Sequence, residues 1–175
     1  MSKLTIDQVN ALSPEDFAAR FGFLFEHSPW VAEQAAQYRP FATLGAMHAA
    51  MARVLFFSDD DQKLAVFRAH PKLADKAAIK AGLTKESASE QASAGLDALT
   101  AEEFEQFSAL NAAYDARFGF PFIIAVRAAG GKAGVLKAMQ ARLDNTDAQE
   151  RRAALDEVVK IVGLRLRDVV EGELL

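Results

Sequence analysis

Apolar residues recur along most of this chain at intervals of three and four, the spacing that places side chains on one face of an α-helix. The pattern is clearest in three segments: Phe17, Phe21, Leu24 and Phe25; Leu44, Met47, Met51, Val54 and Leu55; and Leu155, Val158, Val159, Val162 and Leu166. Each segment predicts an amphipathic helix whose apolar face packs into a core.

Helix start signals precede several apolar segments, either as serine followed by proline or as a capping box. They occur at Ser13-Pro14, Ser28-Pro29, Thr100 with Glu103, and Thr146 with Gln149. The Thr100 signal opens a helix that carries Phe104, Phe107, Leu110 and Tyr114, and Gly119 is placed to cap its end. The last helix is expected to run to about Val170.

Residues 120–126 form the one stretch that resembles a β-strand, with Phe120, Phe122, Ile123, Ile124 and Val126 close together. No second convincing strand exists to pair with it, so a sheet is not expected. The sequence therefore predicts an all-α fold: a single compact helical bundle domain over residues 1–175 with one irregular extended segment near residues 120–126. The backbone amides of that segment must find partners or face a ligand.

Composition narrows the chemistry. The chain has 175 residues, a formal net charge of -4 and no Cys, so disulfides, thiol nucleophiles and thiolate metal sites are excluded. Its acidic balance does not favour binding to nucleic acid. The sequence has neither a signal-peptide pattern nor an apolar run of membrane-spanning length, and a cytoplasmic protein with no membrane partner is expected.

His70 is the strongest candidate for acid-base chemistry. It is expected to end a helix that begins at Asp59 to Asp61, because Pro71 disfavours helical geometry in the residue before it. Imidazole can both take and give a proton near neutral pH. The alternative is a structural histidine packed beside apolar neighbours. His48 and His27 are interpreted as a packing residue and a turn residue.

Glu90 belongs to a polar segment in which Ser87 and Gln91, four residues apart, share one helix face. Such a face could form hydrogen bonds to a polar ring. The alternative is the solvent-facing start of a helix with serine as its cap.

Arg165 interrupts the apolar stripe of the last helix, because Ile161 and Val158 lie four and seven residues before it. A buried guanidinium needs an anionic partner. The pattern leaves two possibilities open: an anion-binding site for a substrate, or a buried salt bridge to an Asp or Glu.

Several short motifs, taken in order, resemble the family of 2-oxo-4-hydroxy-4-carboxy-5-ureidoimidazoline (OHCU) decarboxylases. The motifs are Ser28-Pro29-Trp30, Arg39-Pro40-Phe41, His70-Pro71, Ser87-Ala88-Ser89-Glu90-Gln91, Ala94-Gly95-Leu96, the stretch from Leu110 to Ile123, Arg142-Leu143 and the Leu-Arg-Leu that contains Arg165. The resemblance covers nearly the whole chain. A local departure follows Pro71, where Lys72 and Asp75 stand in places that often hold an acidic residue and a glycine in the family.

The resemblance implies a carboxy-lyase of urate breakdown that forms (S)-allantoin without a cofactor or metal. It implies catalytic roles for His70, Glu90 and Arg165, leaving open whether His70 or Glu90 delivers the final proton. The residues it places against the substrate are Pro71, Ser87, Ala88, Ser89, Gln91, Phe122, Ile123, Ile124, Ala125 and Val126. Family members are often homodimers, so a second copy is a possible partner.

Two other functions compete with this reading. A non-catalytic helical module that binds a ligand or a protein would tolerate loss of His70, whereas the enzyme would not. A metal hydrolase would use the three His and Glu90, but their spacing matches no ligand signature.

Overall fold

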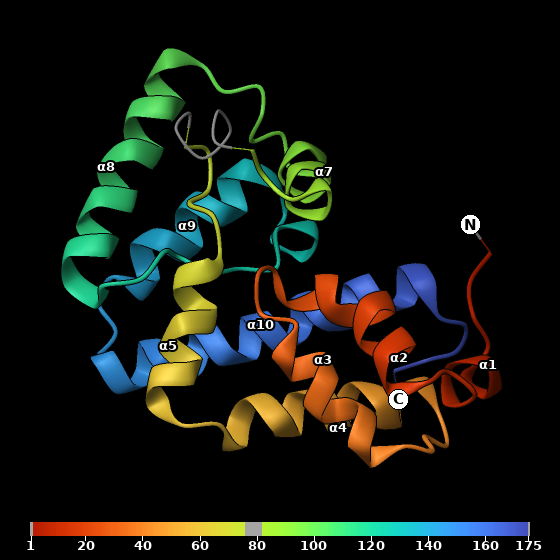
Figure 1. The fold of residues 1–175 in the computed structure, drawn as a ribbon. Helices are drawn as coiled ribbons and strands as arrows, with labels where there is room; N and C mark the ends of the chain where they lie inside the picture. The colour runs from red at the N-terminus through yellow and green to blue at the C-terminus, as the bar shows by residue number, and fades with distance from the viewer. Residues whose placement is uncertain (1, 76–81, 175) are drawn as a thin grey trace. The chain divides into compact units, whose positions relative to one another are not determined.

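The computed structural model describes residues 2–75 and 82–174 and confirms the all-α prediction (Figure 1). Within these residues the β-type pairing consists of an isolated bridge between Leu4 and Val170. None of the described helices is long and apolar enough to cross a membrane. The chain divides into two compact units, one of Met1–Ala69 with Val158–Leu175 and one of His70–Glu157.

The first unit contains short helices connected by tight turns. Its elements are α1 (Ile6–Asn10), α2 (Pro14–Phe21), η1 (Gly22–Phe25), α3 (Trp30–Ala35), η2 (Ala36–Tyr38), α4 (Leu44–Phe57), α5 (Asp60–Ala69) and the C-terminal part of α10 (Asp147–Val169). Helix α3 packs against both α2 and α4. The core between them holds the predicted apolar faces, with Phe17, Phe21, Met47 and Met51 fully buried.

The predicted start signals of this unit are partly confirmed. Ser13 caps α2 by accepting a hydrogen bond from the amide of Asp16, with Pro14 in the first turn. Ser28 does not cap α3 as predicted, because the helix begins one residue later and Pro29 itself occupies the cap position. Asp59 caps α5 by accepting from the amide of Gln62 at 2.7 Å.

The two ends of the described chain pair side by side. The amide of Leu4 donates to Val169 O at 2.9 Å, and the amide of Glu171 donates to Leu4 O at 2.8 Å. Figure 1 shows the first residues running down beside the tail that follows α10. This pairing fixes the segment around Leu4 against the C-terminal end of α10.

The second unit carries most of the predicted site residues. Its elements are α7 (Lys85–Ser93), α8 (Ala101–Phe118), η3 (Val126–Ala128), α9 (Gly131–Arg142) and the N-terminal part of α10. Thr100 and Glu103 form the predicted capping box of α8, and Gly119 caps its end at φ 71, a conformation that favours glycine. Thr146 and Gln149 form the reciprocal hydrogen bonds predicted before α10.

Residues 121–125 have no regular secondary structure, as the sequence predicts. Aromatic rings surround this segment: the Tyr114 ring lies 5.3 Å from the Phe122 ring and 5.8 Å from the Phe120 ring, with both pairs edge to face. Both phenylalanines are 1% exposed. The side chains of the segment are therefore packed in the core of its unit, although its backbone forms no helix or sheet.

Candidate functional site

His70 is the first residue after α5 and is buried, with 8% of its surface exposed. The helix ends at Ala69, one residue before the predicted end at His70, in keeping with the bias against helical geometry before Pro71. Pro71 itself is half-buried. The imidazole is therefore attached to a helix end and largely shielded from water.

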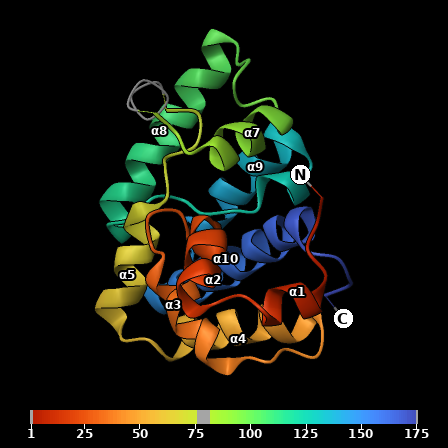
Figure 2. The ribbon, with the colours of Figure 1, turned by 45° about the vertical axis from the view of Figure 1, so that its right-hand side comes forward.

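Residues 72–75, which follow Pro71, run between α7 and α8 in both views of the ribbon (Figures 1 and 2). Lys72 forms an ion pair with Asp115 at 3.1 Å. Leu73 O accepts from Asn111 Nδ2 at 2.8 Å, and the amide of Ala74 donates to Gln91 Oε1 at 3.1 Å. Side chains from α7 and α8 thus hold the loop at two successive residues.

Ala74 takes a backbone conformation that favours glycine, with φ at 56. Strain of this kind costs on the order of 1–3 kcal/mol and persists only where surrounding contacts impose it. The hydrogen bonds to Leu73 and Ala74 are contacts of that kind.

The side-chain amides of Gln91 and Asn111 each use one polar atom to hold this loop, and the other polar atom of each is buried without a partner. A backbone N–H can only donate, so Gln91 must turn its oxygen toward Ala74; a carbonyl can only accept, so Asn111 must turn its nitrogen toward Leu73. Gln91 Nε2 and Asn111 Oδ1 then remain buried without a hydrogen bond. Buried polar atoms of this kind are rare in native proteins and call for an explanation such as a ligand.

Helix α7 places its predicted site residues on different faces. Ser87 and Gln91 are both 5% exposed, so the face they share points into the protein. Glu90 is half-buried, whereas Ala88 and Ser89 are exposed. The cap of this helix is Thr84, which accepts from the amide of Ser87 at 3.2 Å, so the alternative of a serine cap is wrong.

The extended segment from Phe122 to Ala125 is fixed by side chains at two backbone groups. Val126, which was predicted to belong to this segment, instead begins η3. Ile123 O accepts from Arg142 Nη1 at 2.7 Å, and the amide of Ala125 donates to Glu157 Oε2 at 2.7 Å. The segment is buried except at Ile124, which is half-buried. Its backbone is therefore held in one conformation, and the amide of Ala125 is engaged by the protein itself.

Glu150 is the centre of a buried polar cluster next to this segment. It is fully buried, and it accepts hydrogen bonds from Tyr114, Arg142 and Asn145. Burial and the neighbouring Glu150 carboxylate raise the pKa of Tyr114 well above its ordinary value, so the phenol stays protonated and keeps donating.

Arg165 lies in the first unit, where it forms a buried ion pair. Its Nη2 is 2.7 Å from Glu26 Oε1, and Nη1 lies 3.3 Å from Leu24 O. The Arg165 and Glu26 side chains are 3% and 1% exposed. Glu26 has φ 48, which is strained for a residue other than glycine. The salt-bridge alternative is thus present in the structure, and a role toward substrate stays a prediction.

The other two histidines, His27 and His48, belong to the first unit. His48 Nε2 is 2.8 Å from Val159 O, in keeping with a packing residue, and His27 is exposed. In the part of the chain that the structure describes, no group of three or more His, Asp or Glu side chains is arranged to hold a metal ion. The metal-hydrolase alternative therefore has no ligand cluster among these residues.

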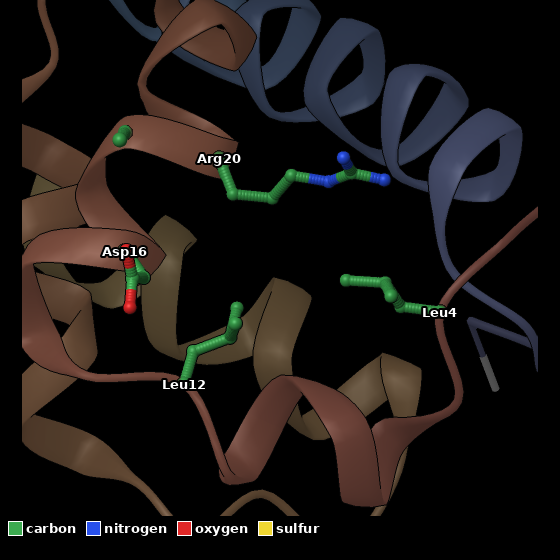
Figure 3. A pocket seen from close by; sticks show the side chains of 5 residues that line it. Leu4, Leu12, Asp16 and Arg20 are labelled. Carbon is green, nitrogen blue, oxygen red and sulfur yellow. The ribbon is translucent and has the colours of Figure 1, made fainter. Parts of the chain in front are cut away.

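A surface cavity of ≈ 410 Å³ in the first unit is lined by Leu4, Leu12, Asp16, Ala19 and Arg20 (Figure 3). None of the predicted site residues contributes to it.

Three buried polar residues were not among the predicted candidates: Asn111, Glu150 and Glu26. A signal for two of them exists in the sequence. Asn111 lies between Phe107 and Tyr114 at helical spacing, and Glu150 stands eight residues before Val158 on the stripe that Arg165 also interrupts. Glu26 follows the last residue of η1 and has no such periodicity.

The chain is similar to several known proteins. A family model described as OHCU decarboxylase matches residues 10–167. The 2-oxo-4-hydroxy-4-carboxy-5-ureidoimidazoline decarboxylase of Haloferax volcanii is 41% identical over 173 residues, which are 99% of this chain and 100% of the relative. The uric acid degradation bifunctional protein of Bacillus subtilis is 36% identical over 166 residues, 95% of this chain and 33% of that protein.

A solved (S)-allantoin synthase has a similar fold. It superposes with a TM-score of 0.77 at 32% sequence identity and covers 96% of this chain. The chain spans about half of that protein, 54% of its length.

Proposed function

Because this chain belongs to the OHCU decarboxylase family, we propose that it removes CO2 from 2-oxo-4-hydroxy-4-carboxy-5-ureidoimidazoline to give (S)-allantoin during urate breakdown. The observation that carries the proposal is the match to a decarboxylase relative across its entire length. The allantoin synthase fold and the uric acid degradation relative support the product and the pathway.

The substrate's own chemistry determines what the protein has to supply. Breaking the bond to the carboxylate leaves an electron pair on the ring carbon, and the adjacent C=N of the imidazoline delocalises that pair. The electron sink is therefore part of the substrate, so a metal or an organic cofactor is not required. The protein must position the substrate and transfer protons to a single face of the ring.

His70 is the proposed acid-base residue. Its burial at the end of α5 shields proton transfer from bulk water, and an imidazole transfers protons in both directions near neutral pH. Glu90, half-buried on α7, is proposed to orient the ring or the ureido group. Pro71, Ser87, Ala88 and Ser89 complete this part of the proposed site.

Gln91 is the proposed substrate-binding residue with the most direct structural support. Its Oε1 is occupied by the amide of Ala74, and its buried Nε2 has no partner. An amide nitrogen donates hydrogen bonds, and the substrate presents carbonyl oxygens that accept them. A bound substrate would therefore satisfy an atom that is otherwise costly to bury.

Arg165 is proposed to hold a substrate oxygen or the carboxylate. A guanidinium has five N–H donors in a planar fork, so an arginine that contacts Glu26 can also bind an anion. The ion pair with Glu26 would then fix the direction of the fork before substrate arrives.

Residues 1–175 are proposed to act as one domain in the cytoplasm. Cell fractionation would test this location. The chain is also proposed to pair with a second copy and to bind neither nucleic acid nor membranes. Most of its phenylalanines are buried, but among the described residues Phe57 and Tyr38 are 83% and 50% exposed, and a dimer could cover them. Light scattering on Phe57→Ser measures that pairing.

The decisive assay starts from fresh 5-hydroxyisourate and its hydrolase and follows (S)-allantoin by circular dichroism, with and without this protein. The proposal predicts that the protein accelerates formation of the (S) enantiomer. Glu90→Gln keeps the side-chain shape and removes the charge, and unaltered kinetics in that variant would remove Glu90 from the catalytic group. A non-catalytic module would leave the spontaneous rate unchanged.

A further inference from the structure

The buried carboxylate of Glu150 is saturated by donors from three side chains of the second unit. Tyr114 donates its hydroxyl, Asn145 donates Nδ2 at 2.6 Å, and Arg142 donates Nε at 2.9 Å and also Nη2. Glu150 itself is 0% exposed and Arg142 is 14% exposed in their side chains. A two-pronged contact of this kind fixes the plane of a guanidinium as well as its position.

The end of the guanidinium that faces away from Glu150 reaches the extended segment. Arg142 Nη1 donates to Ile123 O at 2.7 Å, and the guanidinium carbon lies 4.5 Å from the centre of the Phe122 ring. One arginine therefore holds two successive residues, one through the backbone and one through its ring. The contact with Glu150 determines where Nη1 points.

A second anchor lies two residues further along the same segment. Glu157 Oε2 accepts from the amide of Ala125 at 2.7 Å. The segment has no sheet or helix to satisfy its backbone, so these side chains take over that task. A carbonyl and an amide of one extended stretch are thus fixed by side chains of opposite charge.

We propose that Arg142, aligned by Glu150, is a positioning residue that holds Phe122–Ala125 in the conformation the substrate contacts. The proposal rests on the proposed function, which places this segment against the substrate. It assigns to the buried ion pair a role in substrate binding in addition to its contribution to folding.

Two variants test this role. Arg142→Lys keeps a positive charge beside Glu150, but a single ammonium lacks the planar fork that serves Glu150 and Ile123 together. The triple variant Arg142→Met, Glu150→Leu and Tyr114→Phe removes the buried charges and the phenol at once, so no uncompensated charge remains. Replacements of that kind are often neutral for stability.

Arg117 offers a matched control. It also donates to a backbone carbonyl, Asn145 O at 2.8 Å, and lies 5.2 Å from a phenylalanine ring, that of Phe118. Arg117 is exposed, and both of these contacts are with residues outside the segment. Arg117→Lys therefore repeats the chemical change where no positioning of the segment is expected.

The readouts are KM and kcat per folded molecule, together with hydrogen exchange of the peptide that covers residues 121–126. Arg142→Lys should raise KM roughly tenfold and leave kcat within about twofold, because lost binding of the substrate appears in KM. Exchange of the segment should quicken. Arg117→Lys should change neither. A merely structural role would lower the amount of active enzyme and leave KM unchanged.

Unchanged KM and unchanged exchange in Arg142→Lys would overturn the proposal, as would an equal rise of KM in Arg117→Lys. If the triple variant does not fold, Arg142→Lys alone decides. The wild-type protein could fail to accelerate (S)-allantoin formation while Arg142→Lys still speeds hydrogen exchange of residues 121–126. That result would reject the proposed function and, with it, the role of Arg142 in substrate binding. Intact wild-type activity with unaltered variants rejects the positioning role alone.

Discussion

Arg165 and Glu26 form an ion pair with Nη2 and Oε1 2.7 Å apart, and both side chains are almost completely shielded from solvent. The carboxylate is attached to a backbone with φ 48, so the chain accepts local strain where the partner of Arg165 lies. Two charges taken out of water are a weak source of stability, because their desolvation offsets most of their attraction. The proposed role of the guanidinium toward substrate is therefore to be separated experimentally from its contribution to folding.

Substitution of Arg165 separates these contributions. Arg165→Lys keeps the charge beside Glu26 and loses the planar donor fork, so kcat/KM should fall at least about tenfold, which is about 1.4 kcal/mol of transition-state binding. Arg165→Ala leaves Glu26 uncompensated and should also lower the free energy of unfolding by roughly 3–5 kcal/mol. Urea unfolding and steady-state kinetics measure the two effects.

Arg167→Lys is the control for this pair, because Arg167 is exposed on the same helix. Arg167→Lys should change neither kcat/KM nor the free energy of unfolding. A large loss of stability in Arg165→Ala, combined with normal activity per folded molecule in both Arg165 variants, would restrict Arg165 to a structural role.

Gln91→Glu should weaken ligand binding. The substitution keeps an oxygen for the amide of Ala74 and replaces the unpartnered Nε2 donor by an acceptor. A bound ligand raises stability by about 2.7 kcal/mol at 100 times its Kd, so (S)-allantoin should raise the melting temperature of the wild-type protein. That rise should be much smaller in Gln91→Glu. Equal rises in both proteins would show that Nε2 does not face the ligand.

Tyr114 should resist ionisation in the folded protein. Burial and the hydrogen bond to Glu150 raise its pKa, whereas the unfolded chain releases a tyrosine proton near pH 10. Stability from this group is thus complete below about pH 10 and is lost as pH rises toward the folded-state pKa, because the unfolded state then binds fewer protons.

Absorbance at 295 nm checks this directly. Tyr114→Phe should leave the tyrosinate signal of the native protein at pH 10.5 unchanged and should lower the signal only in denaturant. A drop in the native signal would mean that Tyr114 ionises in the folded state.

Chelation should not affect catalysis. The substrate has its own electron sink, so exhaustive EDTA treatment followed by gel filtration should leave kcat unchanged. Activity that disappears on treatment and returns with added Zn²⁺ or Mg²⁺ would contradict the cofactor-free proposal.

Periodicity and caps predict helices that correspond to α2, α3, α4, α5, α8 and α10, because both signals depend on residues that are near one another in the chain. They did not lead to a prediction of α1 or α9. The same logic flagged Arg165 as a charge on an apolar stripe. It could not name Glu26 as the partner, because that contact joins residues 139 positions apart. Nor could it show that Gln91 holds Ala74, since the direction of each amide depends on the loop packed against it.

The extended segment shows the same limit. Its lack of helical periodicity and of a partner strand is readable from the sequence, whereas the side chains that satisfy its backbone come from α9 and α10. Arg142 is present in the family motif, yet nothing in that motif predicts a contact with Ile123.

The rate of (S)-allantoin formation by the wild-type protein and by His70→Asn tests the central claim most directly. Starting from fresh 5-hydroxyisourate and its hydrolase, the wild type should exceed the spontaneous rate, and His70→Asn should lose a factor of about 100 to 10,000 while its melting temperature changes little. A wild-type rate equal to the spontaneous one, or full turnover in His70→Asn, would contradict the account.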